Sequence, residues 1–167
     1  MGGVTIFWMQ LLVSCAVLSL VAAWYVWPSL TRIPRNSALI LLLFVHVPRY
    51  VGMVELVPGM IDPQLPYVFT SSAAYGDLLE SALALASIIA LRSNWRGTTL
   101  LVLATNTWGF LDLLNGVRGV LQLNVPSFSL ATLWYIYTFY APVVLISHLM
   151  IFGVLIKSRC WVTPKRG

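Results

Sequence analysis

Charged residues are scarce in this sequence. Only 9% of its 167 residues are Asp, Glu, Lys or Arg, whereas 59% are hydrophobic, and the mean hydropathy is +0.87. Soluble domains carry about 25% charged residues, so the deficit excludes an ordinary soluble domain. Several apolar runs approach the roughly 20 residues that a helix needs to cross a bilayer. The sequence therefore predicts an integral membrane protein whose immediate partners are membrane lipids.

Cysteine and histidine are also rare. Two cysteines, Cys15 and Cys160, suggest neither a disulfide framework nor a thiolate metal site. The two histidines, His46 and His148, could ligate a haem only as a minor alternative, because their predicted depths differ by about one turn and no Cys-x-x-Cys-His motif is present. We therefore expect no cofactor and no metal.

Five apolar segments account for most of the length. They predict an all-α bundle of five transmembrane helices in a single membrane domain, residues 1–167, with helices at about 4–27, 37–57, 72–91, 98–120 and 130–156. Pro28 is expected to end the first helix, and Pro48 and Pro142 are expected to kink the second and fifth.

Lysine and arginine are absent from two of the four loops. Eight of the ten basic residues lie in the first loop, the third loop and the C-terminal tail. Because basic loops stay in the cytoplasm, we predict an extracellular N-terminus and a cytoplasmic C-terminus in a cell membrane, the inner membrane if the source is bacterial. The same placement explains the formal charge of +5, so nucleic acid is not an expected partner. The predicted topology does not account for the other two basic residues, Arg49 and Arg118, because neither lies in a cytoplasmic loop.

The charges within the apolar segments gather on three predicted helices. Arg49 lies on the second, Asp77 and Glu80 on the third, and Asp112 on the fourth. At about 1.5 Å per residue, Arg49, Asp77 and Asp112 reach similar depths in the outer half. Ionisable groups inside a span usually face the bundle interior and pair. We predict a site built on these three residues and surrounded by His46, Glu80, Asn106 and Asn115. On the second helix, α-helical spacing puts His46, Tyr50 and Met53 on the face of Arg49.

Three functions are compatible with such a cluster. The first is a pocket for a small lipid-like or amphipathic ligand, which the excess of carboxylates over cations favours. The second is a small proton-coupled transporter or transporter subunit, although only Asn106 and His148 offer a polar path inward. The third is a structural or assembly subunit whose charges fix helix register at a cost in stability. Tyr137 and Tyr140 could line a pocket, whereas Glu55 and Asp62 suit a solvated interface. Whether the protein is an enzyme stays open.

Small residues recur on two predicted helices. Ala82, Ala86 and Ala90 follow one another every four positions on the third helix, and Gly109 and Gly116 lie one heptad apart on the fourth. Such faces let helices approach closely. We expect these two helices to be neighbours, and a homodimer through similar faces is also possible.

Several motifs resemble those of an uncharacterised group. The run Ala73-Ala-Tyr-Gly-Asp77-Leu is followed by Asn106-Thr-Trp-Gly109-Phe-Leu-Asp112-Leu-Leu-Asn115 and by a tyrosine-rich last helix. Together they resemble a widespread group of small bacterial membrane proteins without an assigned function. This resemblance implies the fold and no activity.

A second resemblance is to the EXPERA-type fold of sterol isomerases and sigma-2 receptor-like proteins. It rests on Phe44-Val-His46-Val-Pro48 leading to Glu55, on Gly76-Asp77-Leu78 and on Phe139-Tyr140-Ala141-Pro142. The resemblance implies that Glu55 and Asp77, with His46 nearby, engage a cationic or carbocationic ligand in a pocket open to the membrane. The isomerases carry His-x-x-x-Glu, whereas Tyr50 stands four residues after His46, so isomerase activity is not implied.

Overall fold

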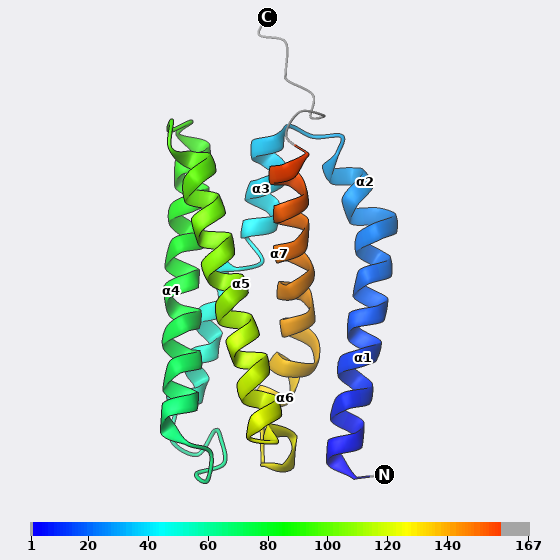
Figure 1. The fold of residues 1–167 in the computed structure, drawn as a ribbon, viewed down its shortest axis with the longest axis vertical. Coiled ribbons are helices and arrows are strands. Elements are labelled where there is room, and N and C mark those ends of the chain that lie inside the picture. The colour runs from blue at the N-terminus through cyan, green and yellow to red at the C-terminus, as the bar shows by residue number, and fades with distance from the viewer. Residues whose placement is uncertain (1, 158–167) are drawn as a thin grey trace, which may run out of the picture.

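The computed structural model describes residues 2–157, and all regular secondary structure in this range is helical, without a strand (Figure 1). Five helices are long and apolar enough to cross a membrane, as expected of a multi-pass membrane protein: Gly3–Leu30, Arg35–Leu56, Tyr67–Arg92, Thr98–Gln122 and Leu133–Ile156. The predicted all-α architecture with five such helices is confirmed. Cys160 and the basic tail residues Arg159, Lys165 and Arg166 lie outside the described range.

The first helix continues past its proline. It consists of α1 (Gly3–Val21), the π-helical segment η1 (Ala22–Val26) and α2 (Trp27–Leu30). The prediction that Pro28 ends this helix is wrong, because the wider π turn before it makes room for a ring that would clash with the preceding α turn. The same arrangement recurs in the last helix, where α6 (Leu133–Tyr135) and π-helical η4 (Ile136–Tyr140) precede Pro142 in α7 (Ala141–Ile156).

The second helix is interrupted instead of kinked. Its first part, α3 (Arg35–Leu43), ends before a short turn, and the chain resumes as the 3₁₀ segment η2 (Val47–Leu56). Two backbone carbonyls at the break accept hydrogen bonds from side chains of the last helix. Ser147 donates to the Leu42 oxygen at 3.0 Å, which also accepts from the Val45 amide, and Tyr140 donates to the Val45 oxygen at 2.7 Å. Such partners are needed because a buried unpaired carbonyl is costly.

The 3₁₀ conformation changes which side chains point inward. A period of three residues per turn aligns Arg49, Gly52 and Glu55, and these are the buried residues of η2. The α-helical spacing assumed from the sequence placed Tyr50 on the same face as Arg49; that placement is wrong, since Tyr50 is 54% exposed.

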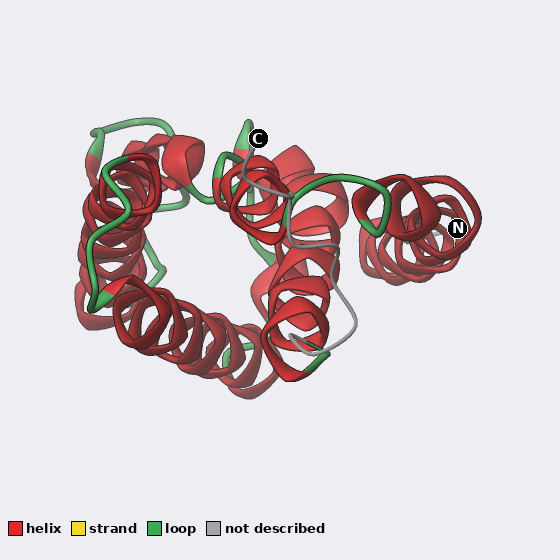
Figure 2. Ribbon diagram, turned by 90° about the horizontal axis from the view of Figure 1, so that it is seen from above, coloured by secondary structure: helices red, strands yellow, loops and turns green. Residues whose placement is uncertain are grey.

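The interrupted helix packs mainly against the third and fifth long helices. The antiparallel pair α4 (Tyr67–Arg92) and α5 (Thr98–Gln122) are neighbours, as expected, and α4 also packs against η2. Helix α7 contacts α3 and α5, while α1 packs against η4 and α7 at the periphery (Figure 2). A short 3₁₀ turn, η3 (Val125–Ser127), joins α5 to α6.

Two apolar clusters lie toward opposite ends of the bundle. One gathers Leu39, Leu43, Ile151 and their neighbours, and the other surrounds Phe7 near the N-terminal end. Several buried polar side chains, among them His46, Arg49, Glu80 and His148, lie between these clusters, at the level where α3 gives way to η2. The interrupted helix thus places the candidate site at mid-height in the bundle.

Candidate functional site

Arg49 is the centre of a buried ion-pair network. Its Nε donates to Asp77 Oδ1 at 2.7 Å, one terminal nitrogen donates to Asp112 Oδ2 at 2.7 Å, and the other donates to the Gly109 carbonyl at 3.3 Å. Arg49 is 4% exposed, whereas the two aspartates remain partly exposed. The structure therefore brings together the three residues that the sequence placed at similar depth.

Glycines make room for both carboxylates. A Cβ on Gly52 would overlap the Asp77 carboxylate, and a Cβ on Gly76 would overlap that of Asp112. The network thus depends on close backbone approach between η2, α4 and α5, which only glycine permits at these points. Gly52 and Gly76 were not among the small residues expected to bring the third and fourth helices together. Gly109, which was among them, faces the Glu80 carboxylate in the same way.

Glu55 is buried, which corrects the expectation of a solvated position. It is 4% exposed, and its Oε1 accepts a hydrogen bond of 3.0 Å from the Tyr137 hydroxyl. Its other carboxylate oxygen has no hydrogen-bond partner among residues 2–157. The 3₁₀ register explains the error, because it puts Glu55 two turns from Arg49 on the same inward face.

A second polar group lies beside the network. The rings of His46 and His148 are 4.2 Å apart, so the expected difference in depth is wrong. The depth count assumed one uniform α-helical rise, which the break after Leu43 removes. Glu80 lies with the histidines, its Oε1 3.9 Å from His46 Nδ1, and Asn106 hydrogen-bonds to His148. These residue types could hold a metal ion.

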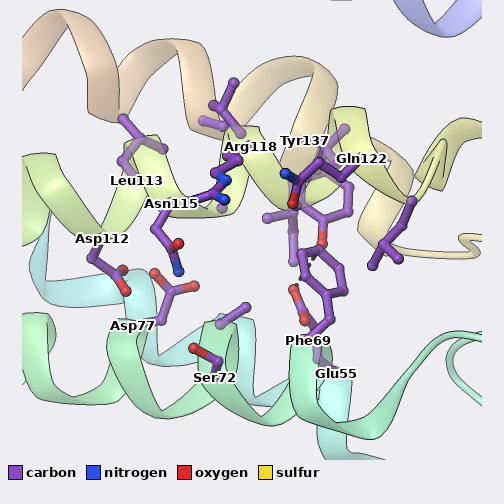
Figure 3. A pocket seen from close by; sticks show the side chains of 18 of the residues that line it. Glu55, Phe69, Ser72, Asp77, Asp112, Leu113, Asn115, Arg118, Gln122 and Tyr137 are labelled. Atoms are coloured by element: carbon purple, nitrogen blue, oxygen red, sulfur yellow. Dashed lines mark hydrogen bonds between the residues drawn. The ribbon is translucent and has the colours of Figure 1, made fainter.

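A cavity of about 470 Å³ opens beside the Arg49 network, toward the N-terminal end of the bundle. Figure 3 shows Asp77 and Asp112 at one end of it and the hydrogen-bonded Glu55 and Tyr137 farther along. Tyr140 also lines it, and its apolar walls include Phe7, Trp8, Phe69 and Val144.

The predicted site residues divide between these two places. Arg49, Asp77, Asp112 and Asn115 line the cavity. His46, Glu80 and Asn106 belong to the buried histidine cluster instead, together with His148, which was not among the predicted site residues. Glu55, Tyr137 and Arg118 also line the cavity. Tyr137 was expected to be able to line a pocket, Glu55 was implied only by the EXPERA-type resemblance, and Arg118 was not predicted. For Glu55, the signal available in the sequence was the three-residue spacing Arg49–Gly52–Glu55 that follows Pro48.

Residues 6–156 match the family described as "Domain of unknown function (DUF8737)". The chain belongs to this family. The match covers all five long helices and both polar clusters, and it agrees with the expectation of an uncharacterised family. Comparisons with curated proteins and with solved structures found no match. The function therefore has to be argued from the site itself.

Proposed function

We propose that this protein binds a small lipid-like or amphipathic molecule in the cavity beside Arg49. We further propose a multi-pass arrangement in a cell membrane with the N-terminus outside and the C-terminus in the cytoplasm. The complete alternation of basic and non-basic loops supports this orientation. With it, the cavity lies in the outer half of the membrane.

The observation that carries the proposal is a cavity that combines apolar walls with partly exposed carboxylates. Its volume of about 470 Å³ falls within the range of small-molecule sites, roughly 300 to 1,000 Å³. A network that serves only as structural glue needs no space beside it. Asp77 and Asp112 instead pair with Arg49 through one oxygen each and retain side-chain exposures of 20% and 16%.

The charges around the cavity favour a ligand with a cationic or hydrogen-bond-donating group. Glu55, Asp77 and Asp112 provide three carboxylates, against the guanidinium groups of Arg49 and Arg118. Arg49 already donates to both aspartates and a carbonyl. A donor on the ligand would pair with the remaining carboxylate oxygens, while its apolar body would contact side chains such as Phe69 and Val144.

From the EXPERA-type resemblance, the proposed function takes only the class of ligand, which is cationic. The two acids that it implies, Glu55 and Asp77, both line the cavity. Its histidine, His46, lies in the neighbouring cluster, and no solved structure matches this chain. We therefore propose binding without isomerase chemistry. A bacterial source and a homodimer stay predictions.

Proton-coupled transport is the second candidate. The aspartates, Glu80 and the histidines form a polar series that runs from the cavity into the bundle. Beyond the histidines, however, the buried side chains are mostly apolar, including Leu39, Leu43 and Ile151. The buried hydroxyls of Ser87 and Thr105 there are hydrogen-bonded to each other at 2.9 Å. This packing supports a blind pocket over a path across the membrane.

The test compares ligand retention in a variant that fills the cavity without touching the charges. Gly116 lines the cavity, and a Cβ there would meet nothing within 4 Å. The wild type and Gly116→Leu would be purified in detergent and compared by native mass spectrometry with lipid analysis. Ala104→Leu, at an exposed position of the same helix, is the matched control.

We expect a bound molecule in the wild type and Ala104→Leu, and its loss in Gly116→Leu at an unchanged melting temperature. A wild type without any bound molecule, or equal retention by Gly116→Leu, would contradict the proposal. Asp77→Asn then tests the charge: it should lose a ligand that carries a cation.

A further inference from the structure

We propose that His46, Glu80 and His148 form a binding site for one divalent transition-metal ion. The three residues come from three separate parts of the chain: the turn before η2, helix α4 and helix α7. Each is 0% exposed, and one ligating atom from each lies within 4.8 Å of the others. The inference is independent of what the neighbouring cavity binds.

The hydrogen bonds of Ser147 define the tautomer of His46. The Ser147 hydroxyl has a single hydrogen, which it donates to the Leu42 carbonyl at 3.0 Å. It must therefore accept the 3.1 Å hydrogen bond that joins it to His46 Nε2. With the proton on Nε2, neutral His46 presents the lone pair of Nδ1 to Glu80. This nitrogen has no hydrogen-bond partner among the described residues.

Asn106 defines the tautomer of His148 in the same way. Its amide nitrogen donates to the His148 carbonyl at 3.2 Å, which orients the side chain. Its Oδ1, which can only accept, lies 2.9 Å from His148 Nδ1. The proton of neutral His148 is therefore on Nδ1, and the lone pair of Nε2 is free. Nε2 also lacks a partner within residues 2–157.

Four buried acceptor atoms of these three residues thus lack a donor from the described residues. They are one nitrogen from each histidine and both carboxylate oxygens of Glu80, all buried and all unpartnered in the described part of the chain. Arg49, the nearby cation, is engaged by Asp77, Asp112 and the Gly109 carbonyl. Buried acceptors without a donor are costly. One proton could bridge a single pair of these atoms, whereas a metal ion would bind all three residues at once.

The donor set matches a transition metal. Two imidazoles and one carboxylate suit zinc, iron and related divalent ions. In known sites each ligating histidine donates its other N–H to an oxygen, as His46 and His148 do here to Ser147 and Asn106. Tetrahedral ligands at 2.0–2.1 Å from zinc lie about 3.3 Å apart. His46 Nδ1 and Glu80 Oε1 lie 3.9 Å apart, and the ligating atoms of all three residues lie within 4.8 Å of one another, so binding requires the side chains to close by about 0.6 to 1.5 Å.

The test uses the full-length protein, stripped with a chelator and equilibrated with Zn²⁺ or Co²⁺. Elemental analysis would give the stoichiometry, and the visible absorption of bound Co²⁺ would report its ligands. The variants are Glu80→Gln, which removes the charged ligand, and Ser147→Ala, which removes the acceptor for His46. Glu55→Gln is the matched control, because it makes the same change at another buried glutamate outside the donor set.

We expect one ion per chain in the wild type and in Glu55→Gln. Ser147→Ala should bind roughly 10- to 100-fold more weakly, as is typical when an outer hydrogen-bond partner is lost, and Glu80→Gln more weakly still. Equal binding by the wild type and Glu80→Gln, or no stoichiometric binding by the wild type, would overturn the proposal. If Glu80→Gln does not fold, the wild-type Co²⁺ spectrum decides: absence of a band that Zn²⁺ displaces would refute the site.

Discussion

The carboxylate of Asp112 occupies the space that a Cβ on Gly76 would fill. This relationship between α4 and α5 lets Asp112 reach Arg49 at 2.7 Å. A side chain at Gly76 has to displace the carboxylate, the backbone, or both. The ion-pair network therefore depends on the absence of a single methyl group.

Gly76→Ala should destabilise the fold by about 1 to 3 kcal/mol, the usual cost of inserting a methyl group into a packed site. Gly116→Ala is the control, since it lies within α5 with nothing within 4 Å of its Cβ. It should stabilise by up to about 1 kcal/mol through higher helix propensity. Unfolding in detergent, followed by circular dichroism, measures both. Equal effects of the two substitutions would contradict the close contact.

Arg49→Met should be among the most damaging single changes. It leaves Asp77 and Asp112 without their cation, and breaking one side of a buried ion pair typically costs about 3 to 5 kcal/mol. Arg49→Lys should restore only part of the loss, because an ammonium group cannot reproduce the three directed hydrogen bonds of the guanidinium. The free energy of unfolding is the measurement. Arg118→Met, at an exposed position, should change it by less than about 0.5 kcal/mol.

Tyr137→Phe should leave Glu55 Oε1 without its hydrogen bond. The cost of an unsatisfied buried acceptor is about 1 to 3 kcal/mol. Tyr135→Phe is the matched control, because Tyr135 is 72% exposed. In a double-mutant cycle with Glu55→Met, the second substitution should cost much less once the first is present. Strictly additive effects would show that the two side chains do not interact.

The proposed orientation can be tested with two exposed serines in different loops. Ser93→Cys and Ser127→Cys would each be made in a chain whose own cysteines, Cys15 and Cys160, are replaced by serine. A membrane-impermeant maleimide added to intact cells should label the cysteine at position 127 and spare that at position 93. Labelling in the opposite pattern would show that the proposed orientation is wrong and that the cavity lies in the cytoplasmic half of the membrane.

The histidine pair illustrates why part of the site was beyond sequence analysis. His46 and His148 are more than a hundred residues apart, and a depth count along uniform helices separated them by a turn. Their contact depends on the break after Leu43 and on side chains of η4 and α7 that donate to the carbonyls at that break. Sequence periodicity does not report such long-range hydrogen bonds.

The sequence by itself determined the number of long apolar helices, their approximate limits and the charges that meet inside the bundle. It could do so because hydrophobic length and the cost of a buried charge are local properties of each segment. Only the tertiary structure decided the 3₁₀ register that buries Glu55, the pairing of the histidines with Glu80 and the cavity beside Arg49. These depend on the break before η2 and on the close approach of neighbouring helices at Gly52 and Gly76. The free energy of that packing is a property of several helices together.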